Sequence, residues 1–223
     1  MNFKRIFSDK QEEFIDYLIA VSSKSSQEIP SIQTISQELG VSQACLREQM
    51  ELARNLGLIK TQPRKGIEIL PYRFTPAVVK SLYFAIKLTQ EYFSQYSELR
   101  NHLEKAFFKE AARLLKASDL DELEELVSSA HKQLYGNPIQ LPHQEHREFH
   151  LLIYKRLDNI FLNGLMEAYW DMYELVGLNV YADLSYLESV WDYHGRIIKR
   201  IRQNEVNEAY ELLINHMNLI NQR

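Results

Sequence analysis

The sequence predicts a mainly α protein, in which a small N-terminal domain of helices and one hairpin precedes an all-helical antiparallel bundle. Two observations predict this division. Four of the six prolines lie among the first 76 residues, and after Pro142 there is no proline and apolar residues recur at the helical spacings of three and four. The segment 71–76 (PYRFTP) holds two prolines between structured stretches, as is typical of a domain boundary. We therefore expect domains at residues 1–73 and 77–223.

Length and composition are those of a folded globular protein. The chain has 223 residues, of which 45% are apolar and 25% are charged, and its formal net charge is −4. No apolar run reaches the roughly 18 residues that a transmembrane helix needs. The charged N-terminus (MNFKRIFSDK) is unlike a signal peptide. Cys45 is the only cysteine, which excludes an internal disulfide and a thiolate metal cluster. We expect a cytoplasmic protein without membrane contact.

Three helices are predicted in the N-terminal domain. Apolar spacing predicts the first over about residues 9–23. The second begins near Ser31 and ends at Gly40, a residue type that commonly terminates helices. Ser42 is a good N-cap for the third helix, which Gly57 ends.

A hairpin follows the third helix. Residues 58–62 and 66–70 alternate apolar and polar side chains, which predicts two strands joined by a short turn. Two helices joined by the tight turn Leu-Gly-Val-Ser and followed by such a hairpin form a winged helix-turn-helix. The third helix can then enter the DNA major groove, while Arg64 and Lys65 reach the backbone or minor groove. Residues 42–73 carry a local excess of three positive charges, which favours DNA binding. A winged helix used only for protein contacts is the alternative.

Five short motifs occur in order between residues 29 and 69: Ile29-Pro30-Ser31, Leu39-Gly40-Val41-Ser42, Leu46-Arg47-Glu48, Gly57-Leu58 and Arg64-Lys65-Gly66. In this order they resemble the DNA-binding domain of the GntR family of bacterial transcription regulators. That family opens with Leu-Pro-Ser, has Leu-Gly-Val-Ser in the turn and Val-Arg-Glu in the recognition helix, and ends an Arg-rich wing with Gly. The resemblance implies DNA contacts from nine residues: Ser31, Gln33, Ser42, Gln43, Ala44, Arg47, Arg64, Lys65 and Gly66.

Three positions depart from the family pattern. Gln33 stands where the family usually has arginine, and Gln43 stands at another position that is often basic. Both changes remove positive charge, so we expect an atypical operator and weaker nonspecific DNA binding. Gln43 can still address adenine, and Arg47 can address guanine. Cys45 replaces a common proline; we interpret it as a small helix residue, with redox sensing as the alternative.

The second domain shows no strand pattern and predicts a succession of helices. Their expected ranges are 77–96, 97–117, 119–135, 143–157, 160–182, 185–203 and 205–220. Ser118 with Asp121 is expected to form a capping box, and Asn204 is expected to cap the last helix.

Four histidines fall on inward faces of three of these helices. His146 and His150 are four residues apart, and His194 and His216 each lie on an apolar stripe. A divalent metal ion would satisfy all four buried imidazoles, although ordinary core histidines are satisfied by their neighbours. The other three histidines lack such spacing and are expected at surfaces or helix ends: His102, His131 and His143.

Three motifs around these histidines, with the segment ELRNHLE at 98–104, resemble the FCD effector domain of the FadR subfamily of GntR regulators. The motifs are His146-x-x-Phe149-His150, Tyr193-His194 and Asn215-His216. Metal-binding members of that subfamily carry Asp-x-x-x-His, a Glu-His pair and a late histidine. The resemblance therefore implies that the ligands here are His146, His150, His194 and His216. It also implies that Arg100 faces an effector pocket, and we expect Tyr193, one of the nearby aromatic residues, to contact the effector as well.

One departure changes the expected metal. His146 stands where the subfamily has aspartate, so a divalent ion held by four neutral imidazoles would leave a site of charge +2 rather than +1. This favours zinc or nickel over manganese. It also favours an anionic ligand, with Arg100 as a second anchor. The dense aromatic residues between the ligand segments are expected to fill the core or to line the effector pocket: Tyr169, Trp170, Tyr173, Tyr181, Tyr186, Trp191 and Tyr193.

The function expected from both resemblances is a ligand-responsive transcription regulator, not an enzyme. A homodimer would bind a roughly palindromic operator, and a small carboxylate at the metal would shift the placement of the two DNA-binding domains. Repression relieved by the ligand is the commoner mode, and activation is the other. Two alternatives are a helical metalloenzyme with an attached winged helix and an acyl-CoA-type sensor without metal.

Overall fold

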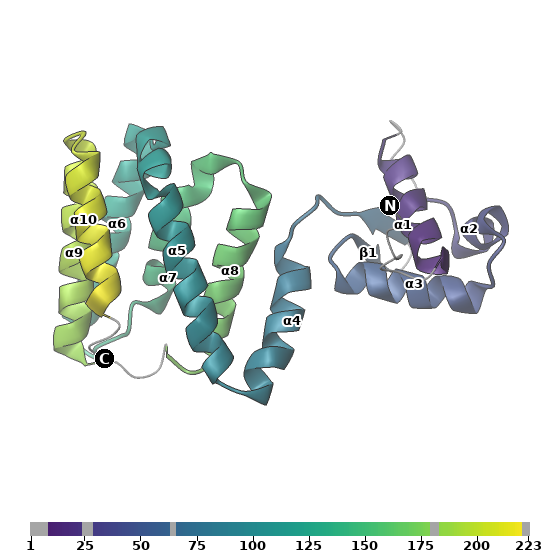
Figure 1. The fold of residues 1–223 in the computed structure, drawn as a ribbon, viewed down its shortest axis with the longest axis horizontal. Helices are drawn as coiled ribbons and strands as arrows, with labels where there is room; N and C mark the ends of the chain where they lie inside the picture. The colour runs from purple at the N-terminus through teal and green to yellow at the C-terminus, as the bar shows by residue number, and fades with distance from the viewer. Residues whose placement is uncertain (1–8, 24–28, 63–65, 179–182, 220–223) are drawn as a thin grey trace, which may run out of the picture. The chain divides into compact units, whose positions relative to one another are not determined.

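In a computed structural model, the described residues are 9–23, 29–62, 66–178 and 183–219. The chain divides into two compact units, Met1–Ala77 and Val78–Arg223 (Figure 1). The protein is mainly α, with a winged helix-turn-helix followed by an all-helical bundle. The elements of the first unit are α1 (Asp9–Ser22), α2 (Ile32–Leu39), α3 (Gln43–Asn55), β1 (Ile59–Gln62) and β2 (Gly66–Ile69). None of the helices in the described part of the chain is long and apolar enough to cross a membrane.

The helix ends in the first unit follow from local sequence chemistry. Ser31 and Ser42 cap α2 and α3, and each side chain accepts a hydrogen bond of 3.2 Å from the amide three residues later. Gly40 ends α2 in the left-handed conformation, with φ of 66°. Gly57, with φ of 73°, follows the end of α3. The sequence predicted all four of these positions.

The core of the first unit joins the three helices to the hairpin. β1 and β2 pair antiparallel, with Ile59 opposite Ile69 and Gln62 opposite Gly66. Eight apolar side chains from α1, α2, α3 and both strands form one buried cluster: Phe14, Leu18, Ile35, Leu46, Met50, Ala53, Ile59 and Ile67. This packing fixes α3 between α1 and the hairpin, and it leaves the polar face of α3 exposed.

The substitution Gly57→Ala is expected to destabilise the first unit by about 3 kcal/mol. The alanine would have to adopt the left-handed backbone conformation, and its Cβ atom would also overlap Pro76. The Cβ would lie 2.6 Å from the Pro76 Cγ atom. Gly40→Ala is the matched control, since Gly40 is also left-handed but has open space around it, and it is expected to cost only about 1–2 kcal/mol. Hydrogen exchange of the α3 amides measures the loss of stability in both variants. Equal losses would show that Pro76 does not constrain this turn.

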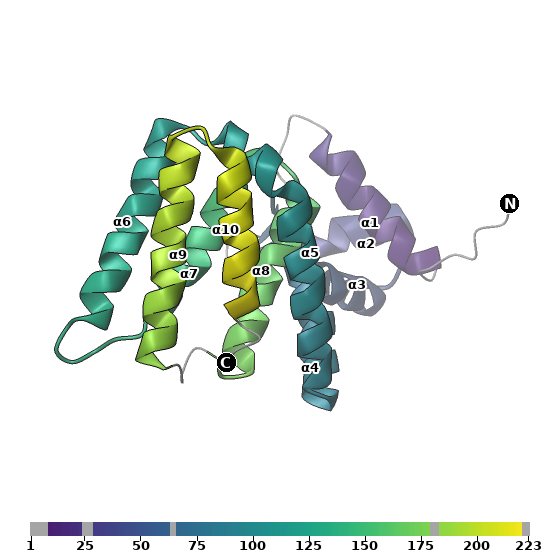
Figure 2. The ribbon, with the colours of Figure 1, turned by 60° about the vertical axis from the view of Figure 1, so that its left-hand side comes forward.

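The second unit is a helical bundle. Its elements are α4 (Thr75–Leu88, which begins just before the unit), α5 (Glu91–Leu114), α6 (Ala117–Leu134), α7 (His143–Tyr154), the 3-10 turn η1 (Lys155–Leu157), α8 (Ile160–Leu175), α9 (Leu184–Arg202) and α10 (Val206–Leu219). Figure 2 shows α6, α9, α10 and α5 in a row with α7 and α8 behind them. Because α7 packs against α5, α6 and α8, its inward face lies near the centre of the bundle.

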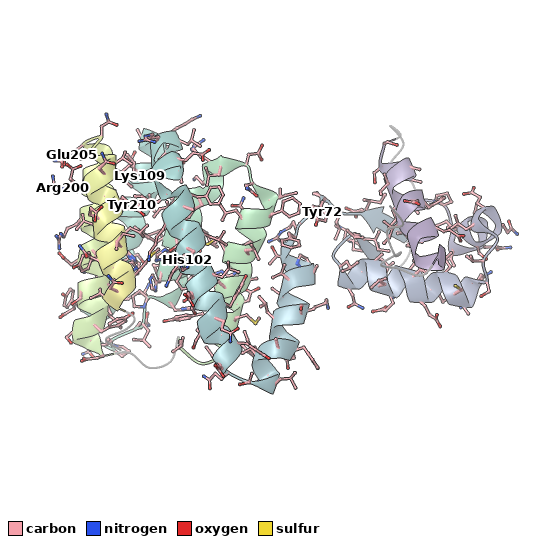
Figure 3. The ribbon with its side chains drawn as sticks, in the orientation of Figure 1. Tyr72, His102, Lys109, Arg200, Glu205 and Tyr210 are labelled. Atoms are coloured by element: carbon pink, nitrogen blue, oxygen red, sulfur yellow. The ribbon has the colours of Figure 1, made fainter. Side chains whose placement is uncertain are left out.

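Side chains from both layers fill the interior of the bundle. Phe108 of α5, Phe149 of α7 and Leu213 of α10 belong to one large buried cluster. At the surface, the Lys109 Nζ atom of α5 lies 4.6 Å from the centroid of the Tyr210 ring of α10 (Figure 3). The α5–α10 contact is therefore apolar inside and closed by a cation on an aromatic ring outside.

The sequence misplaced the break between α4 and α5. It predicted a boundary between residues 96 and 97, whereas α4 ends at Leu88 and α5 begins at Glu91. Residues 89 and 90 are Thr and Gln, so no glycine or proline signals the turn. Tertiary packing decides it, since Ile86 of α4 and Phe93 of α5 are buried in one cluster with residues of α8.

Two predicted caps were also wrong. At the start of α6, the Asp119 carboxylate, rather than Ser118 or Asp121, accepts a 2.7 Å bond from the Lys116 amide. Arg156 also binds the Asp119 carboxylate, which fixes it in this position. Asn204 does not cap α10; it lies in the α9–α10 turn with φ of 62°.

The α9–α10 turn is closed by a contact that the sequence did not predict. The Arg200 side chain binds the Glu205 carboxylate across the turn (Figure 3).

The helix predicted over residues 160–182 ends earlier, at Leu175, and Gly177 follows in the left-handed conformation with φ of 78°.

Candidate metal centre in the helical unit

Four histidines meet in the centre of the bundle. His146 and His150 come from successive turns of α7, His194 comes from α9 and His216 from α10. Because residues four apart share a helix face, both α7 histidines point the same way. We refer to these four residues as the histidine cluster. The structure thus brings together all four residues that the sequence singled out for metal binding.

The distances within the histidine cluster are close to those of a metal site. One nitrogen of each ring lies within 4.8 Å of the chosen nitrogens of the other three. The Nε2 atoms of His194 and His216 are 3.2 Å apart. Nitrogens that bind one zinc ion tetrahedrally at about 2.0–2.1 Å are about 3.4 Å apart. The His194–His216 pair already has this spacing, and the widest pair of the cluster would have to close by roughly 1.4 Å to hold an ion.

The chemical state of the cluster also suits metal binding. Three of the rings are at most 2% exposed, and His146 is partly exposed although its Nε2 atom is buried. Burial lowers the pKa of all four imidazoles well below its usual value, and the positive charge of Arg100 lowers it further. The rings are therefore neutral at pH 7 and can donate lone pairs to a cation.

Several nitrogens of the cluster lack hydrogen-bond partners among the described residues. The Nε2 atoms of His146 and His150 are buried and unpaired, as are the Nδ1 atoms of His194 and His216. Buried nitrogens usually have a partner. An ion bound through the four Nε2 atoms would account for the unpaired nitrogens of His146 and His150, so the residues present fit the group.

A buried ion pair lies against the cluster. Arg100 and Glu104 sit one turn apart on α5, and the Arg100 Nη2 atom is 2.9 Å from the Glu104 Oε1 atom. Both atoms are also 2.9 Å from the His150 Nδ1 atom. Burial raises the pKa of Glu104 to about 7, although Arg100 and His216 oppose the shift. The Glu104 Oε2 atom has no partner among the described residues.

The sequence reasoning missed Glu104. A signal was available, because Glu104 continues a stripe with the spacing of three and four that includes Phe93, Tyr96, Arg100 and Phe108. All five of these residues are buried. An acidic and a basic residue four apart within an apolar stripe indicate a buried pair, which needs a further partner inside the fold.

Aromatic rings surround the histidines. Phe149 stacks on His194, with ring centroids 4.0 Å apart. Trp170 meets His146 at 4.9 Å and Trp191 meets His194 at 4.8 Å. The sequence did not decide whether these aromatic residues fill the core or line a pocket. The two tryptophans are core residues, each 1% exposed. This shell buries His150, His194 and His216 and leaves only His146 partly exposed.

The two residues predicted to bind the effector neighbour different members of the histidine cluster, Arg100 beside His150 and Tyr193 beside His216. Arg100 is 3% exposed and is held by Glu104. Tyr193 is half-buried; its ring centroid is 6.4 Å from that of His216, and the Arg196 guanidinium lies over it at 5.1 Å. Tyr181 lies outside the described residues.

A small cavity opens beside His146. Its volume is about 20 Å³, and its lining includes Leu141, His143, His146, Tyr173, Leu187 and Trp191. A space of this size accommodates a water molecule but not an organic acid. It reaches the partly exposed member of the histidine cluster, so it marks the side from which a small ligand would approach.

The other histidines lie at a surface or a helix end, as the sequence predicted. His102 is exposed on α5, and His131 lies in the last turn of α6. His143 is the first residue of α7; it stacks on Tyr173 with centroids 5.4 Å apart and contacts Glu174 at 2.9 Å.

The residues predicted to bind DNA are on the surface of the first unit wherever they are described. Exposed positions are Ser31, Gln33, Ser42, Gln43, Ala44, Arg47 and Gly66. Arg64 and Lys65 lie outside the described residues. On α3, Arg54 contacts Glu51 and Thr61, whereas Arg47 forms no ion pair within the described part of the chain. Cys45 is half-buried and accepts a contact of 3.4 Å from Gln49, as a small helix residue would.

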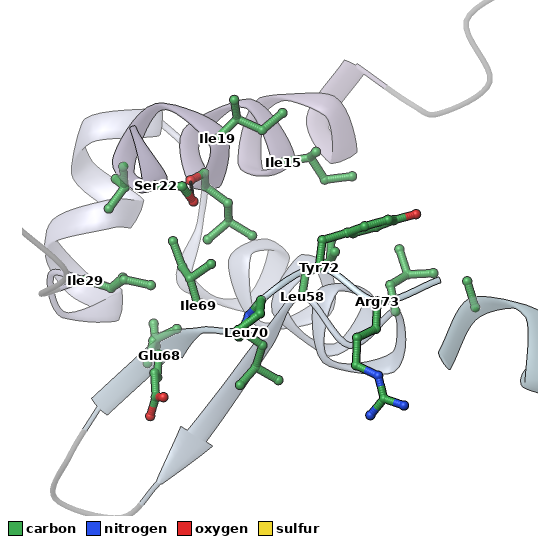
Figure 4. Close-up of a pocket in the computed structure, with 16 residues that line it drawn as sticks. Ile15, Ile19, Ser22, Ile29, Leu58, Glu68, Ile69, Leu70, Tyr72 and Arg73 are labelled. Atoms are coloured by element: carbon green, nitrogen blue, oxygen red, sulfur yellow. Dashed lines mark hydrogen bonds between the residues drawn. The ribbon is translucent and has the colours of Figure 1, made fainter. Parts of the chain in front are cut away.

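The first unit also contains a hollow of about 1240 Å³ (Figure 4). Ile15 and Ile19 of α1 face Leu58, Leu70 and Tyr72 across it. The lining is mainly aliphatic and contains none of the residues that the sequence predicted to bind DNA, metal or effector. We assign no ligand to it.

Comparison with known proteins gives two kinds of match. Residues 95–219 match a protein-family model described as FCD domain. Among solved structures, the chain is similar to Streptococcus agalactiae GntR, with 19% identity, a TM-score of 0.70, and coverage of 96% of this chain and 97% of that chain. It is also similar to Escherichia coli McbR/YncC (17% identity, TM-score 0.49, coverage 97% and 99%) and to a GntR-family transcriptional regulator from Pseudomonas syringae pv. tomato str. DC3000 (21%, 0.45, 93% and 81%). No curated protein matched the sequence.

Proposed function

This chain belongs to the FCD-domain family of GntR-type transcription regulators, and from that premise we propose that a divalent metal ion in its helical unit controls its binding to operator DNA. Residues 1–73 would form the DNA-binding domain, and residues 77–223 the effector and dimerisation domain. The proteins of this family are transcription regulators rather than enzymes, so the proposal involves no catalysis.

Regulators of the GntR family bind operator DNA and typically dimerise. We propose a homodimer on a roughly palindromic operator, with α3 of each copy in a major groove. Exposure of the polar face of α3 supports this reading. The contacts would come from the nine residues named above for the winged helix, with Arg47 reading a base and Arg64 and Lys65 reaching the backbone or the minor groove.

One observation carries the metal proposal: four neutral imidazoles, three of them buried, converge, and two of the four have buried, unpaired Nε2 atoms. His146, His150, His194 and His216 would hold the ion through nitrogen alone, which favours zinc or nickel over harder ions. The ion would supply a double positive charge and a Lewis acid at the centre of the bundle. The histidines themselves would tie α7, α9 and α10 together, and folding and metal binding would therefore stabilise each other.

We propose a small carboxylate as the organic effector, with Arg100 and Tyr193 as its contacts. Two features bear on how it would bind. The cavity beside His146 holds only about 20 Å³, and Arg100 is engaged by Glu104. A carboxylate would therefore bind an arrangement in which the helices beside His146 have moved apart. A ligand with different affinities for two arrangements shifts their populations, which is the coupling that regulation requires.

The test is a DNA-binding selection with the pure protein, repeated after chelation, after restoration with zinc or nickel, and with a panel of small organic acids. We expect a selected duplex whose binding changes with chelator and with one acid. Binding of a selected duplex that responds to neither would contradict metal control. Failure to select any duplex would contradict the DNA-binding assignment, independently of the metal.

Arg47→Ala is expected to weaken binding to the selected duplex about 5–150-fold, because a base contact by arginine contributes about 1–3 kcal/mol. Arg54→Ala is the matched control on the same helix, since Arg54 is already engaged by Glu51 and Thr61. Fluorescence anisotropy with labelled duplex at fixed salt measures both. Equal losses would show that Arg47 acts only through its charge.

A further inference from the structure

The Nδ1 atom of His150 has two polar neighbours that make opposite demands. The Arg100 Nη2 atom and the Glu104 Oε1 atom are each 2.9 Å away. A guanidinium can only donate, so a bond from Arg100 needs an unprotonated Nδ1. A carboxylate oxygen accepts, so a bond to Glu104 needs a proton on Nδ1. A neutral imidazole carries one proton, and the choice of partner therefore decides which nitrogen keeps a lone pair.

Hydrogen-bond satisfaction favours the bond to Glu104. Arg100 has other acceptors, because Nη2 also lies 2.9 Å from Glu104 and Nη1 donates to Asn101 at 3.2 Å. Glu104 is 0% exposed, and its carboxylate gains a second donor from an Nδ1–H of His150, whereas Arg100 Nη2 keeps its acceptor on Glu104 in either tautomer and the unpaired Arg100 Nε atom is affected by neither. The opposite tautomer would also place a buried N–H on the Nε2 atom of His150, which has no acceptor among the described residues.

We infer that Glu104 is a positioning residue, which accepts the Nδ1 proton of His150 and so leaves the Nε2 lone pair available to the histidine cluster. Glu104 would not touch the ion; it would fix the tautomer and the orientation of one ligand, as carboxylates behind metal-bound histidines do. The consequence for metal binding rests on the proposed function, whereas the tautomer is a property of the metal-free chain.

Two substitutions separate the acceptor from the charge. Glu104→Gln keeps an oxygen where Oε1 lies, and it is expected to retain the Nδ1–H tautomer and to bind zinc within a few-fold of the wild-type affinity. Glu104→Met fills a similar volume without an acceptor, so Arg100 becomes the polar neighbour of Nδ1 and the proton moves to Nε2. We expect the affinity of Glu104→Met for zinc to fall by about 10–100-fold.

The tautomer is read by ¹⁵N NMR of the histidine rings in the metal-free full-length protein at about pH 8.5, where the Glu104 carboxyl is ionised, and the affinity by zinc competition with a chelator at the same pH. A general loss of packing would not move the proton between ring nitrogens, so the NMR readout is specific to positioning. An Nδ1–H tautomer in Glu104→Met, or an unchanged zinc affinity, would overturn the inference. A wild-type chain with the Nδ1–H tautomer that binds no zinc would instead contradict the proposed function.

Glu104→Met leaves Arg100 buried without its counter-charge, and this could prevent folding. The double variant Arg100→Met with Glu104→Met removes both charges and covers that case. Without either neighbour, His150 is expected to show a mixture of tautomers and a zinc affinity below that of the wild type. A pure Nδ1–H tautomer with wild-type affinity in the double variant would overturn the inference.

Discussion

Replacement of His194 by alanine is expected to weaken zinc binding by about 100-fold, because it removes one of four ligands from a site whose binding free energy is about 10–16 kcal/mol in comparable structural zinc sites. His194 is 0% exposed, and its Nε2 atom lies 3.2 Å from that of His216. No neighbouring side chain in the described part of the chain offers a replacement nitrogen at that position. Elemental analysis of purified protein and chelator competition measure the change.

His143→Ala is the matched control for this experiment. His143 lies on α7 with His146 and His150, but it stacks on Tyr173 and contacts Glu174 instead of joining the histidine cluster. It is expected to bind zinc as the wild-type chain does. Equal metal content in His194→Ala and His143→Ala would contradict the assignment of the four histidines as ligands.

Acidification of the metal-free protein from pH 7.5 to 5.5 is expected to lower its free energy of unfolding by several kcal/mol. The pKa of each clustered imidazole is lowered in the folded chain, whereas in the unfolded chain it is about 6.5. Below that pH the unfolded chain takes up protons that the folded chain does not, so each imidazole removes up to about 1.4 kcal/mol of stability per pH unit.

Glu104 opposes this effect over part of the range. Its pKa rises to about 7 in the folded chain from the ordinary value of 4.5. Between these values the folded chain holds a proton that the unfolded chain lacks, so this one group adds stability as the pH falls. Four imidazoles outweigh one carboxyl, which leaves a net loss of up to about 4 kcal/mol per pH unit.

Urea unfolding of the chelated protein at several pH values measures the loss. The control variant is His102→Ala, because His102 is exposed on α5 and its removal leaves the buried imidazoles in place. It is expected to show the same pH dependence as the wild type. A free energy of unfolding that does not change between pH 7.5 and 5.5 would contradict neutral, buried imidazoles.

Local patterns were enough to predict the winged helix and the inward direction of the four histidines, whereas their meeting at one site was implied by the resemblance to FCD domains. Ser31, Gly40 and Ser42 act on their own helix ends, so their roles are independent of the rest of the fold. The spacing of His146 and His150 likewise needs only helical geometry. For His194 and His216, an apolar stripe on each helix was enough, because such a stripe faces the bundle core wherever the helix packs.

Features that depend on distant partners were beyond the sequence. The bend between α4 and α5 comes from burial of Ile86 and Phe93 against α8, not from a glycine or proline. The Asp119 cap depends on Arg156, which is 37 residues away in the chain. The apolar stripe on α5 signals that Glu104 is buried, but its contact with His150 could not be predicted, because His150 lies on another helix.

The aromatic residues around the histidine cluster give the protein an intrinsic fluorescent reporter of that cluster. Trp170 and Trp191 are the two tryptophans of the chain, and their rings lie 4.9 Å from His146 and 4.8 Å from His194. All indole emission therefore arises beside the imidazoles. Nickel, with its partly filled d shell, would quench this emission, whereas zinc, with a full d shell, would leave it bright. The tryptophan fluorescence of the unlabelled protein, measured during titration with each metal, would thus distinguish nickel from zinc.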